Sequence, residues 1–305
     1  MSAVEAVLGV DVGGTTVKAA LVRRDDLTII DRSSAPTDPR AISAGILALA
    51  RPLLHRAAER GLTVSHAGIG VPEFVRDGRV TSAEVIEWTG TEPGELGALL
   101  RTSSHDEVSV RVDSDVRCGA RAEAHLLPDP AQSALYVSWG TGISSTFVLP
   151  GGVCWEGATG RAITLGAWPS AASAFTVEEF SSGLGIARRF RALHGGDTHP
   201  ARAGEELTTL AVSRRADSGD VEAEVFLAEA GRVLATAVLQ AVDLLDPHVV
   251  ILGGGLGVSD STAPRAAFEA LRARPGLAAL PARLGADSGL IGAALGTTPF
   301  DGQLR

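Results

Sequence analysis

Apolar residues in this chain gather in short runs that end at glycine-rich turns, and two of these turns share one design. Residues 5–11 and 16–22 form two such runs, and the turn "DVGGTT" joins them. Residues 133–153 repeat the design, with "WGTGISS" between two further apolar runs. The pattern therefore predicts a β-hairpin with a glycine–threonine turn in each half of the chain.

The segments around the hairpins predict helices and buried strands. Residues 41–61 carry apolar side chains at helical spacing and end at a glycine. Residues 66–75 predict a short buried strand, and residues 108–127 predict a strand, an acidic turn and a helix. The longest helix is predicted over residues 222–246, directly before the buried strand and glycine turn "HVVILGGG". No linker or low-complexity run interrupts this order.

Length and composition agree with a globular protein of two domains. The chain has 305 residues, of which 45% are hydrophobic and 21% charged, which is enough apolar surface for a sizeable core. No stretch approaches the roughly 18 uninterrupted apolar residues of a membrane span. The first residues also lack the basic region of a signal peptide. We therefore expect neither membrane insertion nor secretion.

Net charge and cysteine content limit which binding partners and which cellular location are expected. The formal net charge is −9, which disfavours general affinity for the phosphate backbone of DNA or RNA, so no nucleic-acid partner is expected. Cys118 and Cys154 are the only cysteines, so the sequence predicts no disulfide framework and no cysteine-rich metal site. A reduced cytoplasm is the expected location.

The two glycine–threonine turns carry the first candidate chemistry. Glycine lets the backbone approach a ligand closely, and threonine adds hydroxyl and amide donors. Two such turns facing each other across a cleft would hold a polyphosphate. Asp11 would lie near those phosphates, where a carboxylate is favourable only with a cation between them, and Mg²⁺ bound through water is the usual solution. Each turn alone is equally compatible with a plain tight hairpin.

Several motifs, taken in order, resemble one known family. They are "DVGGTTVK", "GIGVPEFV…DGRVTSAE", "VDSDVRCGARAE", "WGTGISS" and "LDPHVVILGGGLG", and together they span about residues 6–260. This ordered set resembles the ROK family of sugar kinases, which belongs to the actin, Hsp70 and hexokinase-like superfamily. The resemblance implies an α/β fold of two ribonuclease-H-like lobes, with ATP and a sugar bound in the cleft between the domains.

The resemblance also implies how the chain is divided. We expect an N-terminal α/β domain over residues 1–117 and a larger C-terminal α/β domain over residues 118–289. A final segment, about residues 290–305, is expected to return to the first domain. No helix-turn-helix segment precedes the first predicted strand, so a repressor role is not expected. A homodimer is the expected assembly.

The resemblance implies that the three glycine turns bind the nucleotide. The phosphates of ATP are expected to lie against both hairpin turns, with Asp11 acting on them through Mg²⁺ and water. Adenosine is expected to lie against the backbone of the third glycine turn. The expected nucleotide-binding residues are Asp11, Gly13, Gly14, Thr15, Thr16, Lys18, Gly140, Thr141, Gly142, Gly253, Gly254 and Gly255.

The family's catalytic aspartate precedes a helix in an "N-D-A-N" turn, which corresponds here to "SDVR". Asp115 is therefore the expected general base, which removes the proton of the sugar hydroxyl as that hydroxyl attacks the γ-phosphate. Asp113, two residues earlier, is the competing candidate, and the register of Glu123 favours Asp115. A helix N-cap is the structural alternative for Asp115.

The chain departs from the family at one edge of the sugar site. The family's "G-E-I-G-H" corresponds to "ITLGAWP", where Thr164 and Ala167 replace the glutamate and histidine that hold the sugar. In the family, that histidine and three following cysteines bind zinc, but "SAASAFTVEEFSSG" contains none of these ligands. Since zinc needs about four of them, no zinc site is expected.

The other expected sugar contacts are acidic. By resemblance, Glu178 occupies the place of a sugar-binding glutamate; a surface helix glutamate is the structural alternative, and Glu179 is the register alternative. Glu73 and Glu84 stand where the family has neutral residues, and Glu87 lies close by. The expected substrate-binding residues are Glu73, Glu84, Ser114, Asp115, Thr164 and Glu178.

A surface position is one alternative for these glutamates. If they are buried, a carboxylate needs a positive partner, and the sequence leaves two kinds open. One is an arginine; the candidates are Arg76, Arg79 and Arg117. The other is the ammonium of an amino sugar.

The expected function is therefore ATP- and Mg²⁺-dependent phosphorylation of the primary 6-hydroxyl of a hexose-like amino sugar. Kanosamine (3-amino-3-deoxyglucose), an intermediate of antibiotic biosynthesis, is the sharpest candidate. A C7-cyclitol or glucose kinase of the same family is the alternative. A non-catalytic sugar-sensing protein is the alternative from another functional class.

Overall fold

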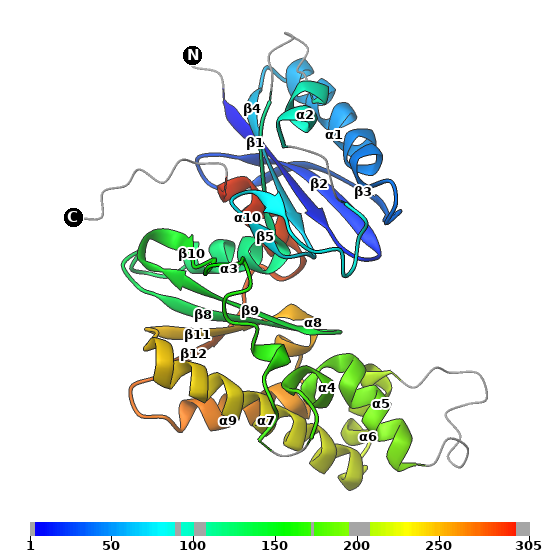
Figure 1. Cartoon of the computed structure of the whole chain (residues 1–305), viewed down its shortest axis with the longest axis vertical. Helices are drawn as coiled ribbons and strands as arrows, with labels where there is room; N and C mark the ends of the chain where they lie inside the picture. The colour runs from blue at the N-terminus through cyan, green and yellow to red at the C-terminus, as the bar shows by residue number, and fades with distance from the viewer. Residues whose placement is uncertain (1–3, 89–92, 101–107, 172–173, 195–207, 297–305) are drawn as a thin grey trace. The chain divides into compact units, whose positions relative to one another are not determined.

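The computed structural model describes residues 4–88, 93–100, 108–171, 174–194 and 208–296 (Figure 1). Contacts divide the chain into two compact units. The first unit comprises residues 1–130, 152–162 and 286–305, and the second comprises residues 131–151 and 163–285.

The first unit is built on a five-stranded sheet of order β3-β2-β1-β4-β7. Its strands are β1 (Glu5–Val12), β2 (Thr16–Arg23), β3 (Ile29–Pro36), β4 (Thr63–Val71) and β7 (Ser109–Ser114). The first three strands form an antiparallel meander, whereas β1, β4 and β7 are parallel. The carboxyl ends of these parallel strands therefore lie at one edge of the sheet, which we call the first edge.

Helices cover both faces of this sheet. They are α1 (Ile42–Glu59), α2 (Pro93–Leu99), α3 (Asp115–His125) and α10 (Ser288–Leu295). Leu8 and Val10 of β1 share a core with α1, and the alternate residue Val7 packs with α10. A Cβ at Gly9 or Gly68 would collide with backbone carbonyls of α10, so glycine lets this helix lie directly on the sheet. Two short strands, β5 (Val75–Arg76) and β6 (Arg79–Val80), form a hairpin, and β10 (Val153–Cys154) lies in the 152–162 segment.

The second unit repeats the hairpin-plus-parallel-strand design. Its strands are β8 (Ala134–Trp139), β9 (Ile143–Leu149), β11 (Val249–Gly253) and β12 (Ala278–Pro281). Strands β8 and β9 pair antiparallel, while β11 is parallel to both β8 and β12. The turns after β8 and β11 therefore share one edge, which we call the second edge.

The second unit also contains helices, and α7 is the longest helix of the described chain. They are α4 (Val177–Ser181), α5 (Gly183–Leu193), α6 (Thr209–Asp217), α7 (Val221–Leu245), α8 (Gly254–Gly257) and α9 (Thr262–Arg272). Helix α7 is long and apolar enough to cross a membrane by composition alone, but 61% of its most apolar window is buried within the protein, as in a core helix. Gly231 lets α9 approach, because a Cβ there would meet the carbonyl of Ala263.

The predicted hairpins, the strands at residues 66–75 and 108–112, and the helices at residues 41–61 and 222–246 are all present within a few residues of their expected bounds. Helix α3 belongs to the first unit, where it packs against α10. The domain boundary expected at residue 117 stays a prediction, because compactness in the native chain does not measure independent folding.

Candidate active site

Three carboxylates follow the three parallel strands of the first sheet. Asp11 lies at the end of β1, Glu73 follows β4, and Asp115 follows β7. In open α/β sheets, ligands bind outside the carboxyl ends of the strands. The topology thus brings together residues that are 62 and 104 positions from Asp11 along the chain.

Asp115 is the first residue of α3, but it does not cap the helix. The N-cap is Ser114, whose hydroxyl accepts a 3.4 Å hydrogen bond from the amide of Arg117. The Asp115 carboxylate accepts a 2.6 Å bond from the neighbouring Val116 amide. Burial and the charge of the Asp11 carboxylate raise the pKa of Asp115 to about 7. A carboxylate that titrates near neutral pH is well matched to general-base chemistry.

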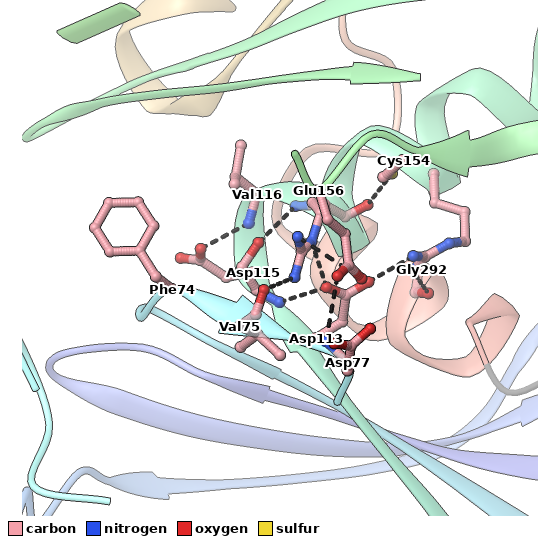
Figure 2. A network of polar contacts seen from close by, with 12 residues as sticks. Phe74, Val75, Asp77, Asp113, Asp115, Val116, Cys154, Glu156 and Gly292 are labelled. Atoms are coloured by element: carbon pink, nitrogen blue, oxygen red, sulfur yellow. Dashed lines mark hydrogen bonds and ion pairs between the residues drawn. The ribbon is translucent and has the colours of Figure 1, made fainter. Parts of the chain in front are cut away.

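Asp113, the competing candidate, is held by two arginines (Figure 2). Its Oδ1 lies 2.5 Å from Nε of Arg117, and its Oδ2 lies 2.6 Å from Nη2 of Arg121. The amide of Ser114 also donates to Oδ1 at 2.8 Å. Within the described chain, no arginine or lysine lies within ion-pair distance of Asp115. The contacts therefore make Asp113 a structural ion partner and leave Asp115 as the carboxylate available for chemistry.

The two arginines tie separate segments to the turn that carries Asp115. Arg117 is only 3% exposed and donates to the carbonyl of Val75 in β5 at 2.6 Å. Arg121 donates to the carbonyl of Gly292 in α10 at 3.2 Å. Figure 2 shows these contacts surrounding the junction of β7 and α3. Arg117 was one of the arginines suggested as a partner of the acidic residues near the sugar site, but it forms its ion pair with Asp113.

The first glycine turn joins β1 to β2 and carries a built-in ion pair. Nζ of Lys18 lies 3.5 Å from Oδ2 of Asp11 and 3.3 Å from the carbonyl of Ala286. Burial raises the pKa of Asp11, and the Lys18 ammonium opposes that shift. A buried carboxylate with one partly exposed cation beside it suits an additional hard cation such as Mg²⁺, approached through water.

The backbone of this turn offers amide donors. Among the described residues, the amides of Gly14 and Thr15 donate to no protein group. Thr37, just after β3, holds the turn through two hydrogen bonds. Its hydroxyl donates to the Gly13 carbonyl at 2.6 Å, and its amide donates to the Thr15 carbonyl at 3.0 Å. Sequence reasoning missed Thr37, because nothing in its neighbourhood marks it as a partner of a turn more than 20 residues away.

The second glycine turn joins β8 to β9 and is fixed by α5. The amides of Gly183 and Leu184 donate to the carbonyls of Gly140 and Thr141 at 2.8 and 3.1 Å. Among the described residues, the amides of Thr141 and Gly142 donate to no protein group, so this turn also offers donors.

The third glycine turn, residues 253–255, follows β11 at the second edge. A Cβ at Gly253 would collide with Tyr136, and one at Gly254, where φ is +76°, would collide with the backbone of Trp139. A Cβ at Gly140 would lie 3.8 Å from the amide of Gly255, so the second and third turns are neighbours. The residues expected to bind phosphates and adenosine in this unit are therefore adjacent.

Glu178 and Glu179 are distinguished by their contacts. Glu179 forms a capping box with Thr176 at the start of α4, so its carboxylate is committed to the helix terminus. Oε2 of Glu178 accepts a 2.6 Å bond from the amide of Ile143, directly after the second glycine turn. The geometry favours Glu178 as the residue that faces the turn. Thr164 begins a 3₁₀ turn next to Gly166, and a Cβ at Gly166 would contact the Cβ of Glu178.

Among the described residues, the Glu73 carboxylate is paired with backbone amides and one hydroxyl, not with an arginine. Its carboxylate is 6% exposed and accepts bonds from the Ser82 hydroxyl and from the amides of Glu84, Val85 and Ile86, at 2.9, 2.6 and 2.8 Å for the amides. A carboxylate has about four acceptor positions, and these donors fill them. The expected arginine partner is wrong for this residue, and the case for a ligand ammonium at Glu73 loses its physical basis.

The other two glutamates pair with arginines near the surface. Oε1 of Glu84 lies 3.6 Å from Arg161, and Oε1 of Glu87 lies 3.9 Å from Arg40. The side chains of Glu84 and Glu87 are 59% and 69% exposed, so these are surface ion pairs, and neither arginine is among those that the sequence suggested. Arg76 pairs with its neighbour Asp77 instead.

Both cysteines are buried in the first unit. Burial raises the pKa of Cys118 well above its ordinary value and that of Cys154 to about 11. The thiolate form is therefore scarce at neutral pH, and Cys118 packs as a small buried residue.

Comparisons with known proteins agree with this arrangement. A sequence profile of the ROK family matches residues 7–297. The chain belongs to the ROK family. It is 28% identical to an N-acetylmannosamine kinase of Salmonella typhi over 308 aligned positions, which cover 94% of this chain and 97% of the relative.

Solved structures of the family have the same fold. A ROK hexokinase from Thermus thermophilus aligns with TM-score 0.73 and 24% identity over 96% of this chain and 97% of that one. A ROK glucokinase from Streptomyces griseus, solved with glucose and AMPPNP, aligns with TM-score 0.74 and 23% identity over 96% and 99%. The predicted family, fold class and enzyme class, an ATP-dependent carbohydrate kinase, are confirmed.

Proposed function

We propose that this ROK-family member transfers the γ-phosphoryl group of ATP to the primary 6-hydroxyl of a hexose-like sugar, with Asp115 as the general base. The observation that carries the proposal is the contrast at the β7–α3 junction. Asp113 is fixed by two arginines, whereas Asp115 has no cation partner among the described residues and a pKa of about 7.

In this mechanism the Asp115 carboxylate accepts the hydroxyl proton while the hydroxyl oxygen forms a bond to the γ-phosphorus. The bond between the β- and γ-phosphates breaks, and ADP leaves. Bound Mg²⁺ would neutralise charge on the phosphates, and Asp11 is the residue that would hold it through water. The amides of Gly14 and Thr15 in the first turn, and of Thr141 and Gly142 in the second, would hold phosphate oxygens.

On the sugar, Glu178, Thr164 and Ser114 remain the proposed contacts. Glu84 remains a candidate, and Glu73 is supported only as a residue that positions its loop. Kanosamine stays the sharpest named substrate from the sequence, but the contacts of Glu73, Glu84 and Glu87 give it no charge advantage over a neutral sugar. N-Acetylmannosamine, named for the relative that is 28% identical, is a neutral candidate.

A substrate panel with ADP detection tests the proposal. It covers glucose, N-acetylmannosamine, kanosamine and a C7 cyclitol, each with ATP and Mg²⁺. Sugar-dependent ADP release that is lost in Asp115→Asn supports the proposal. Binding of ATP and sugar without ADP release would instead support the sugar-sensing alternative. Homodimer formation and a cytoplasmic location stay predictions.

A further inference from the structure

The Glu73 carboxylate organises the loop Ser82–Ile86. Three successive backbone amides, those of Glu84, Val85 and Ile86, converge on it, and the Ser82 hydroxyl completes the set. Ser82 also accepts a 2.8 Å bond from the amide of Phe74, so the loop is tied to the residue next to Glu73 as well. Because burying a carboxylate is unfavourable unless every acceptor is satisfied, this charge stays only while the loop keeps its conformation.

The far end of the loop is anchored independently. Ile86 and Trp88 are buried in the core of the first unit, and the Trp88 indole donates to the Ser43 hydroxyl at 2.9 Å. The amide of Glu87 donates to the carbonyl of Pro39 at 3.0 Å. The segment between these two anchors has little freedom to move.

Val85 is a residue of this segment whose side chain is exposed next to the first glycine turn. Its side chain is 49% exposed, although its two neighbours in the loop are a paired glutamate and a buried isoleucine. Its Cγ1 would lie 3.1 Å from a Cβ placed on Gly14, so it stands directly over the first glycine turn. The buried Glu73 carboxylate thus holds an apolar side chain beside the amides to which the proposed function assigns phosphate.

We propose that Val85 is a specificity-determining residue of the kinase reaction and that Glu73 is its positioning residue. The acceptor then meets Val85 with a C–H face of its ring, and not with a hydroxyl or an ammonium group. This inference rests on the proposed function and deepens it. It assigns the acceptor an apolar patch on the side that faces Gly14, whichever sugar or cyclitol it is.

Hydrogen exchange on the Glu73→Gln variant tests the positioning role without any activity measurement. The amide side chain keeps the volume but places an NH₂ group against the backbone donors. We expect the amides of residues 84–86 to exchange at least tenfold faster, while those of β1 and β4 are unchanged. Glu84→Gln, a change in the same loop at an exposed residue, is the matched control and should leave these amides protected. Unchanged exchange in Glu73→Gln would overturn the positioning role.

Kinetics of Val85→Thr test the specificity role, since threonine has the same shape and adds one hydroxyl. On the best acceptor of the panel we expect kcat/KM to fall about tenfold through KM, because the ligand would cover an unpaired hydroxyl. Val225→Thr, the same change at an exposed valine of α7, is the control and should have no effect. The specificity role is wrong if an acceptor is turned over and Val85→Thr behaves like wild type. If no acceptor is turned over or bound, the proposed function and the Val85 role both fail, while the exchange experiment still decides the role of Glu73.

Discussion

The two units of this chain repeat one backbone design with different chemistry. The first edge gathers charged side chains: Asp11 with Lys18, and Asp115 with a pKa of about 7. The second edge gathers backbone donors from two glycine turns, and Glu178 is the carboxylate that contacts one of them. The two edges thus share a backbone design but differ in the groups they offer: ionisable side chains at the first, and mainly backbone amides at the second.

The largest expected effect comes from metal removal. If the charges of the first edge need Mg²⁺, chelation with EDTA should abolish phosphoryl transfer, and added Mg²⁺ should restore it. The far-ultraviolet circular dichroism should stay unchanged, because the sequence predicts no structural zinc. One tightly bound zinc per purified chain would contradict this expectation, and elemental analysis measures it directly.

Replacing the two aspartates of the β7–α3 junction should separate chemistry from structure. Asp115→Asn should lower kcat by roughly 10²–10⁴-fold with nearly unchanged nucleotide affinity, because general-base catalysis is lost. Asp113→Asn should instead lower the free energy of unfolding by about 3–5 kcal/mol, since it leaves buried arginines without their partner. Urea denaturation and single-turnover kinetics on both variants measure these effects. If Asp113→Asn folds normally and is the inactive variant, the assignment of the base is wrong.

The pH dependence of kcat/KM should follow the titration of Asp115 at the first edge. Because the pKa of Asp115 is raised to about 7, the carboxylate is protonated below that pH and the base is lost. We expect kcat/KM to rise about tenfold per pH unit up to pH 7 and then to level off. A profile that stays flat down to pH 5 would argue against Asp115 as the base.

At the second edge we expect a smaller effect. Glu178→Gln should lower kcat/KM for the sugar about tenfold, which is the size of one charged hydrogen bond. Glu179→Gln is the matched control: glutamine can take the place of glutamate in the capping box of α4, so this change should leave both stability and KM nearly unchanged. Equal kinetic effects of the two changes would remove the distinction drawn between these glutamates.

The smallest expected effect is on stability. A carboxyl group whose pKa is higher in the folded than in the unfolded state destabilises the fold at pH values above the unfolded pKa, and the penalty is complete above pH 7. Asp115→Asn should therefore raise Tm by several degrees at pH 8 and leave it nearly unchanged at pH 4. A tenfold difference in proton affinity between the folded and unfolded states corresponds to about 1.4 kcal/mol. Calorimetry at the two pH values checks the sign.

The sequence was sufficient for the hairpins, the long helices and the family, because apolar spacing and glycine turns are local signals. It also placed Asp115 and Glu178 next to their alternatives, Asp113 and Glu179. The sequence could not show which member of each pair is held by other protein groups. The arginines that bind Asp113 and the capping box that contains Glu179 depend on the three-dimensional structure.

Glu73 shows why the acidic side of the pocket was misread. From the sequence, a positively charged partner was predicted for Glu73, because a charged side chain is the usual partner of a buried carboxylate. The partners are mostly backbone amides, which every residue but proline carries and which leave no mark in a sequence. Thr37 escaped notice for the same reason, since it fixes the first turn through the turn's own carbonyl groups.

Lys18, finally, is the chain's only lysine, and it lies beside Asp11. An arginine there would grip the carboxylate through two parallel bonds in a fixed plane, whereas an ammonium is a compact charge on a flexible stem that releases its partner easily. At 3.5 Å the contact is a loose one. Lys18 therefore leaves Asp11 a loosely held carboxylate, which is the kind of group that would hold Mg²⁺ through water.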